Sequence, residues 1–145
     1  MTSTYLLTKK ENTVFFSSRK KKVLIIDDDP SLQRLLHVRL KMHEDVTVIV
    51  AMDGENGLAQ ANAHNPDLII LDWMLPGIQG PEVLEHLKRE SKLKNTPVLM
   101  LTGRNKVGNI ENAFNLGADA YLTKPVSLQI LGEKVSNMLN PTSLN

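Results

Sequence analysis

The sequence predicts an α/β domain with a doubly wound parallel sheet of five strands and five helices. Five short runs rich in Val, Ile and Leu alternate along the chain with five segments of helical periodicity. The first of these runs, Val23-Leu24-Ile25-Ile26, is continuously apolar, which is typical of a strand buried on both faces of a parallel sheet. A chain of 145 residues that is 41% hydrophobic can bury one such core and is too short for two.

The first strand is predicted at residues 23–26 and ends in the acidic run Asp27-Asp28-Asp29. Pro30 follows, which suits the first turn of a helix, and Asp28 or Asp29 can cap that helix. Apolar residues then recur at helical spacing, with basic residues on the other side. We expect four leucines to form the apolar side of this helix: Leu32, Leu35, Leu36 and Leu40.

The remaining elements repeat this unit. Strands are predicted at residues 46–51, 68–71, 98–101 and 120–123, and helices at residues 56–64, 81–88, 107–115 and 127–139. Gly117 is placed to close the fourth helix, and Ser127 is placed to cap the fifth. Right-handed crossovers would place helices on both faces of the sheet.

The chain divides into an N-terminal extension (residues 1–21), one folded domain (residues 22–140) and a C-terminal tail (residues 141–145). Residues 1–20 show no sustained period of 2 or 3.6 residues, so we expect a flexible extension. Residues 1–22 carry six basic residues and one acidic residue, although the net charge of the chain is only +1. Because the positive charge is concentrated in this extension, we expect no direct binding to nucleic acid.

Composition excludes several classes of protein. The chain has no cysteine, which excludes disulfides, thiolate metal sites and a cysteine nucleophile. No apolar run reaches the ~20 residues that span a bilayer. The apolar stretch near the N-terminus is shorter than the core of a signal peptide. We therefore expect a cytoplasmic protein with no membrane segment.

Polar side chains follow four of the five predicted strands. Asp27 and Asp28 follow the first strand, Asp72 the third, Thr102 the fourth and Lys124 the fifth. Ligands of open parallel sheets bind at the carboxyl ends of the strands. We therefore expect three carboxylates, a hydroxyl and an ammonium group to meet at one edge of the sheet.

These groups are suited to phosphoryl transfer. Clustered carboxylates need a cation, and a small number of hard oxygen ligands favours Mg²⁺ with retained water. A carboxylate can accept a phosphoryl group covalently. The transfer depends mainly on positioning and charge stabilisation, which a metal, a lysine and a hydroxyl supply. The sequence has no Gly-rich phosphate loop after its first strand, so the usual modes of nucleotide binding are not indicated.

Four segments at the predicted strand ends are specific in combination. They are Val23-Leu24-Ile25-Ile26-Asp27-Asp28-Asp29, Leu71-Asp72-Trp73-Met74-Leu75-Pro76-Gly77, Leu101-Thr102-Gly103 and Gly117-Ala118-Asp119-Ala120-Tyr121-Leu122-Thr123-Lys124-Pro125. In this order, across residues 22–139, the chain resembles the receiver domain of two-component response regulators. The resemblance implies a flavodoxin-like topology with strand order 2-1-3-4-5.

The resemblance also implies a role for each residue at the strand ends. Asp72 would be the phospho-acceptor, taking its phosphoryl group from a sensor histidine kinase or a phosphotransfer protein. Asp28, Asp72 and the backbone carbonyl of Met74 would ligate Mg²⁺ directly, while Asp27 would act through a metal-bound water. Lys124 would pair with the phosphoryl group, and its peptide bond to the following proline is expected to be cis.

The same resemblance implies a conformational switch rather than an enzyme with external turnover. Thr102 would move to bond the phosphoryl oxygen, and Tyr121 would follow it inward. The last two helices and the fifth strand would present the changed surface to a downstream protein effector. Because the chain ends soon after its last predicted helix, we expect a receiver that stands alone or is separated from its output domain. Whether phosphorylation also drives formation of a homodimer is open.

Two alternative functions are a phosphate-independent adaptor and a Mg²⁺-dependent aspartyl-phosphate phosphatase. The complete set of polar residues argues against the adaptor. Such phosphatases use an Asp-x-Asp motif, whereas Asp72 is followed by Trp73 and Met74.

Met74 is apolar where the family commonly has a polar residue, so we expect it to hinder the water that would hydrolyse an acyl phosphate. Trp73 is expected at the rim of the site, half exposed.

Overall fold

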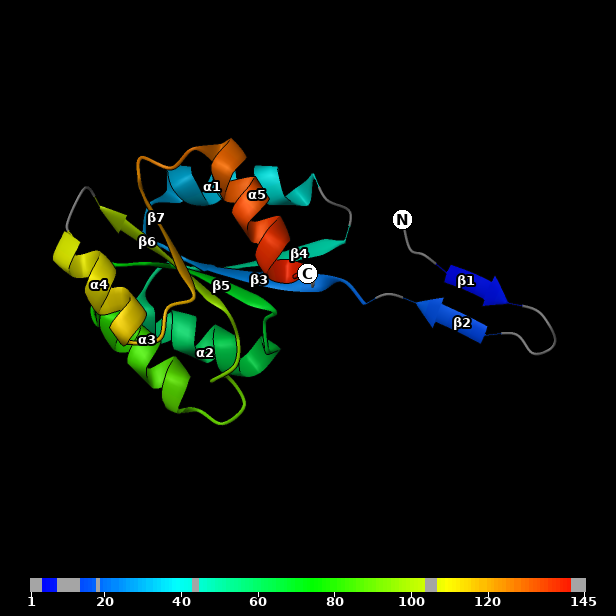
Figure 1. Ribbon diagram of the computed structural model, residues 1–145, viewed down its shortest axis with the longest axis horizontal. Helices are drawn as coiled ribbons and strands as arrows, with labels where there is room; N and C mark the ends of the chain where they lie inside the picture. The colour runs from blue at the N-terminus through cyan, green and yellow to red at the C-terminus, as the bar shows by residue number, and fades with distance from the viewer. Residues whose placement is uncertain (1–3, 8–13, 18, 43–44, 104–106, 142–145) are drawn as a thin grey trace.

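A five-stranded parallel sheet forms the centre of the domain, as the sequence predicts (Figure 1). The computed structural model describes residues 4–7, 14–17, 19–42, 45–103 and 107–141. The sheet consists of β3 (Lys21–Ile26), β4 (Val46–Ala51), β5 (Leu68–Asp72), β6 (Val98–Gly103) and β7 (Ala120–Lys124). Its order is β4-β3-β5-β6-β7, which is the predicted order 2-1-3-4-5.

Five helices cover the two faces of this sheet (Figure 1). Residues of α1 and α5 share one apolar cluster with one face of the strands, and residues of α2, α3 and α4 share a second cluster with the opposite face. The arrangement is therefore three-layered, with the sheet in the middle. The helices are α1 (Pro30–Lys41), α2 (Gly54–His64), α3 (Gly80–Arg89), α4 (Val107–Asn115) and α5 (Leu128–Leu139).

The central strands each contain a continuous apolar run because both faces of the sheet are covered. All five residues of β5 are buried, and its alternate side chains enter different clusters: Ile69 and Leu71 one, Leu68 and Ile70 the other. Continuous burial explains why the sequence shows an uninterrupted apolar run here rather than alternation.

Helix ends follow the chemistry that the sequence predicts. The Asp29 carboxylate accepts hydrogen bonds from the backbone N–H groups of Ser31 and Leu32 and caps α1. The Ser127 hydroxyl accepts one from the N–H of Ile130 and caps α5. Gly117 adopts a φ of +109° directly after α4, a conformation that favours glycine.

The predicted apolar side of α1 is wrong in one respect. Leu36 and Leu40 are buried as expected, but Leu35 is 51% exposed and Gln33 is buried in its place. Residues 33, 36 and 40 are three or four positions apart and so share one face, whereas Leu35 lies on another. The excess of leucines in this helix made the apolar side look wider than it is.

The N-terminal extension also differs from the expectation. No element is predicted in residues 1–20, but the structure contains a separate antiparallel pair, β1 (Thr4–Leu7) and β2 (Val14–Ser17). The residues of these two strands, TYLL and VFFS, do not alternate between apolar and polar, so they show no period of 2 in the sequence. The flexibility of the extension and the boundaries of the domain remain predictions.

Among the residues that the structure describes, no helix is both long and apolar enough to cross a bilayer.

Candidate functional site

Three carboxylates meet at the carboxyl ends of two neighbouring strands. Asp27 and Asp28 directly follow β3, and Asp72 is the last residue of β5, which pairs with β3. Each contributes one oxygen to a group in which all oxygens lie within 4.8 Å of one another. Asp27 is fully buried and Asp72 is 5% exposed, whereas Asp28 is exposed. The cluster therefore has a buried floor and one side open to solvent.

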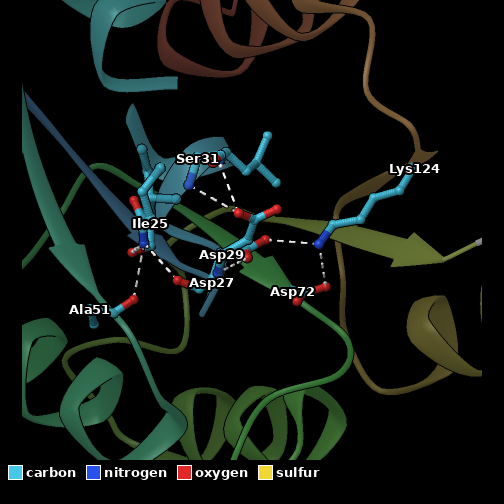
Figure 2. Close-up of polar contacts among 9 residues, drawn as sticks. Ile25, Asp27, Asp29, Ser31, Ala51, Asp72 and Lys124 are labelled. Atoms are coloured by element: carbon cyan, nitrogen blue, oxygen red, sulfur yellow. Dashed lines mark hydrogen bonds and ion pairs between the residues drawn. The ribbon is translucent and has the colours of Figure 1, made fainter. Parts of the chain in front are cut away.

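Lys124 supplies a positive charge to this cluster from a strand that does not adjoin β5. Its Nζ lies 3.0 Å from Oδ2 of Asp27 and 3.2 Å from Oδ1 of Asp72 (Figure 2). The sheet order places β6 between β5 and β7, so the long lysine side chain bridges the intervening strand. The peptide bond between Lys124 and Pro125 is cis, as expected.

The electrostatics of the cluster raise the pKa of Asp72. Burial and the neighbouring charge of Asp27 raise the pKa of Asp72 to about 6, although Lys124 opposes the shift. Burial alone would lower the pKa of Lys124, but the carboxylates of Asp27 and Asp72 outweigh it and raise that pKa above its usual value. Lys124 thus stays charged, and one ammonium group faces three carboxyl groups.

Thr102 lies on the strand next to Asp72. The register pairs Asp72 with Leu101, and the N–H of Trp73 donates to the Leu101 carbonyl at 2.9 Å. Thr102 is fully buried, and among the described residues its hydroxyl has no hydrogen-bond partner. Buried polar atoms are normally paired, so an unpaired one is an exception. This hydroxyl can therefore form a hydrogen bond with a group that enters the site.

Tyr121 lies on β7, in register with Met100. It is half-buried, and its ring meets that of Phe114 edge-on, with 5.3 Å between the centroids. Phe114, on α4, is 47% exposed. The pair therefore lies partly exposed between α4 and β7. These elements belong to the face that is predicted to bind an effector.

The loop after Asp72 is held close to the strand. A side chain at Gly80 would collide with the backbone carbonyl of Asp72, so only glycine lets α3 begin this close. The N–H of Gly80 donates to the carbonyl of Trp73 at 2.8 Å. Trp73 is half-buried, as expected, and Met74 is 69% exposed beside the acceptor.

The donor set fits Mg²⁺. It consists of hard carboxylate oxygens, and the exposed Asp28 leaves room for an ion that keeps several waters. Asp27, Asp28 and Asp72 each offer one carboxylate oxygen to this group. The structure thus brings together Asp27, Asp28, Asp72 and Lys124 as predicted, and Thr102 lies on the adjoining strand. The individual roles assigned to them, and to the Met74 carbonyl, remain predictions.

One residue that adjoins this cluster, Gln33, is not among the site residues predicted from the sequence. Its side chain is buried and donates to the backbone carbonyls of Ile25, Asp27 and Ala51. The available signal was its spacing of three from Leu36, which places a polar residue on the buried side of α1.

Comparison with known proteins gives a consistent result. The family model "Response regulator receiver domain" matches residues 23–136. The phosphate regulon transcriptional regulatory protein PhoB of Escherichia coli is 40% identical over 95 residues, which cover 66% of this chain and 42% of PhoB. The DNA-binding dual master transcriptional regulator RpaA of Synechocystis is 40% identical over 113 residues, covering 78% of this chain and 46% of RpaA.

Solved structures agree with the family match. The receiver domain of the Francisella response regulator 1452 superposes with a TM-score of 0.78 at 31% identity, covering 86% of this chain and 100% of that chain. The chain spans less than half the length of the two curated relatives.

Proposed function

The chain belongs to the family of response regulator receiver domains, and from this premise we propose that it is a switch activated by phosphorylation of Asp72. The observation that carries the proposal is the position of Asp72 at a strand end, 3.2 Å from Lys124 and grouped with Asp27 and Asp28. The phosphoryl donor is a phosphohistidine on a sensor histidine kinase or a phosphotransfer protein. The chain assists this transfer and the later hydrolysis but turns over no external substrate.

The reaction forms one bond and breaks one. A carboxylate oxygen of Asp72 attacks phosphorus, the P–N bond of the phosphohistidine breaks, and its electron pair remains on the imidazole nitrogen. The product is an acyl phosphate on Asp72. The attack requires the ionised carboxylate, which a pKa of about 6 makes the main form at neutral pH.

The surrounding residues stabilise the charge of the transferred group. Asp28, Asp72 and the backbone carbonyl of Met74 would hold Mg²⁺, with Asp27 acting through a bound water. When bound, Mg²⁺ would neutralise the carboxylates and the phosphoryl oxygens. Lys124 lies close enough to both buried carboxylates to turn to a phosphoryl oxygen once Asp72 is modified. Its positive charge would then stabilise the charge that develops on the phosphoryl oxygens in the transition state.

The switch couples the site to the surface through Thr102 and Tyr121. The unpaired hydroxyl of Thr102 moves to the phosphoryl group, and Tyr121 follows into the space that it leaves. Tyr121 then loses its edge-on contact with Phe114, which changes the face formed by α4, β7 and α5. A protein effector reads this face, and phosphorylation shifts the population between the two states. We place this signalling in the cytoplasm.

Replacing Met74 by Asn is expected to speed hydrolysis of the acyl phosphate. The exposed Met74 side chain lies two residues after the acceptor and presents no polar atom able to orient water strongly. An Asn amide can orient the water that attacks the acyl phosphate, and positioning of a reactant raises the rate of a reaction. We therefore expect hydrolysis to be several-fold faster in Met74→Asn. The measurement is decay of the phosphorylated protein after the phosphodonor is removed, with Met52→Asn as the exposed control. An unchanged rate in Met74→Asn would show that Met74 does not protect the acyl phosphate.

The proposed function is tested by locating the modification. The protein is incubated with acetyl phosphate and Mg²⁺, and the acyl phosphate is reduced with borohydride, which converts a modified aspartate to homoserine. We expect peptide mass analysis to find homoserine at position 72. Reduction at another aspartate would contradict the assignment of the acceptor.

A further inference from the structure

Gln33 is a buried polar residue next to the carboxylate cluster. It lies in the first turns of α1, and only 6% of it is exposed. Its Nε2 lies 3.1 Å from the Ile25 carbonyl, 2.9 Å from the Asp27 carbonyl and 3.1 Å from the Ala51 carbonyl. Figure 2 labels the three residues whose carbonyls accept these bonds, Ile25, Asp27 and Ala51. One side-chain amide thus connects α1 to the ends of β3 and β4.

The three neighbours determine the orientation of the amide. All three are carbonyl oxygens, so the group that faces them has to be the N–H₂ donor. The Oε1 atom of Gln33 has no hydrogen-bond partner among the described residues. A buried, unpaired oxygen is unfavourable, and an apolar side chain of similar size would avoid this cost. The amide is therefore poorly explained by packing alone.

The contacts of Gln33 lie at the carboxyl end of β3, where Asp27 and Asp28 follow the strand. The Asp27 carbonyl belongs to the peptide bond that joins Asp27 to Asp28. The N–H of Asp27 donates to the Ala51 carbonyl at 3.1 Å, which is itself bonded to Gln33. Gln33 is thus bonded to two groups: the Ala51 carbonyl, which also accepts from the N–H of Asp27, and the carbonyl of the Asp27–Asp28 peptide.

The Asp27 side chain is fixed separately. One carboxylate oxygen accepts from the N–H of Asp29 at 2.9 Å, and the other faces Lys124. The exposed Asp28 carboxylate takes its direction from the backbone, because rotation of the preceding peptide plane would swing it away from Asp27 and Asp72. Among the contacts of the described residues, the Gln33 amide is the side-chain group that opposes this rotation.

We propose that Gln33 is a positioning residue that orients the Asp27–Asp28 pair for binding a divalent cation. This inference rests on the proposed function, because it assigns Gln33 a role toward the Mg²⁺ that Asp28 and Asp72 would hold. Residues that orient metal ligands typically contribute 10- to 100-fold in metal affinity. Gln33 touches neither the ion nor the phosphoryl group and acts only through the backbone of its neighbours.

The test compares Mg²⁺ affinity in the wild type and in Gln33→Met by isothermal titration calorimetry. Methionine keeps the length of the side chain and removes the donors. We expect Mg²⁺ to bind Gln33→Met about 10-fold more weakly than the wild type. Asn62→Leu is the matched control, because the exposed Asn62 amide also donates to a backbone carbonyl, that of Leu58 at 3.0 Å, within α2. The control should bind Mg²⁺ like the wild type.

The outcomes separate the inference from the proposed function. Wild-type affinity in folded Gln33→Met would overturn the role of Gln33 while leaving the receiver function intact. A wild type that binds no Mg²⁺ would overturn the metal site and the inference together. If Gln33→Met does not fold, Gln33→Asn gives the answer, since its shorter amide withdraws from the three carbonyls but remains polar. Loss of affinity in Gln33→Asn supports the inference, and unchanged affinity overturns it.

Discussion

Replacing Asp72 by Asn is expected to stabilise the metal-free protein at pH 7.5 by about 3 kcal/mol. Burial and the charge of Asp27 raise the pKa of Asp72 from an ordinary value of 3.8 to about 6. At pH 7.5 the folded chain therefore holds an ionised carboxylate that it accommodates less well than the unfolded chain does. Asparagine has the same shape and no charge. Urea unfolding in the presence of EDTA measures the difference.

The pH dependence gives this prediction a definite sign. The pKa of Asp72 is higher in the folded state, so between pH 4 and pH 6 the folded chain binds more protons than the unfolded chain. The contribution of Asp72 to wild-type stability is therefore fully present below about pH 4 and is lost as the pH rises through about 6. The advantage of Asp72→Asn should be largest above pH 6 and should shrink toward pH 4.

Asp67 supplies a control of opposite sign. Burial alone would raise the pKa of Asp67, but its bonds from Arg19 and from the N–H of Lys22 lower it. Asp67→Asn should therefore destabilise the protein at pH 7.5, with a loss that fades as the pH falls through the folded pKa of Asp67. A destabilised Asp72→Asn at pH 7.5 would contradict our description of the carboxylate cluster.

Replacing Lys124 by Gln is expected to slow phosphorylation by acetyl phosphate about 100-fold, the lower end of what removing one preorganised electrostatic group costs. The Lys124 ammonium lies 3.2 Å from the acceptor carboxylate and 3.0 Å from Asp27. Without it, the transferred phosphoryl group would lose a fixed positive charge in a partly buried site. The rate is measured at saturating Mg²⁺, so that weaker metal binding does not enter the comparison.

Lys88→Gln is the matched control for this variant. Lys88 is also partly buried and lies 3.6 Å from a carboxylate, that of Asp119, and it donates to the Thr96 carbonyl. These contacts lie at the amino end of β6, away from Asp72. Lys88→Gln should be phosphorylated at the wild-type rate. Equal rates in the wild type and Lys124→Gln would show that Lys124 takes no part in the transfer.

The sheet and the position of the site could be predicted because both depend on local sequence. Continuous apolar runs identify buried strands, and the residues directly after them occupy one edge of a parallel sheet. Asp27, Asp72 and Lys124 therefore meet although 97 residues separate the first from the last. The strand bounds were short by one or two residues at some ends, since Lys21 and Lys124 extend β3 and β7 beyond their apolar parts.

The contacts of Gln33 and Arg19 could not be predicted, because they depend on which groups the folded backbone leaves nearby. Gln33 is buried because three carbonyl oxygens lie within its reach. Arg19, within the extension expected to be flexible, donates to both carboxylate oxygens of Asp67 at 2.8 and 3.1 Å. The spacing of Gln33 from Leu36 indicates a buried position but not which carbonyl groups it meets, and Asp67 lies 48 residues from Arg19 in the sequence.

The central claim, that Asp72 accepts a phosphoryl group with the help of Mg²⁺, is tested most directly by intact mass spectrometry. The wild type and Asp72→Asn are each incubated with acetyl phosphate, once with Mg²⁺ and once with EDTA. We predict a gain of one phosphoryl group in the wild type with Mg²⁺ and none in the other three samples. Equal uptake by Asp72→Asn, or equal uptake in EDTA, would contradict the claim.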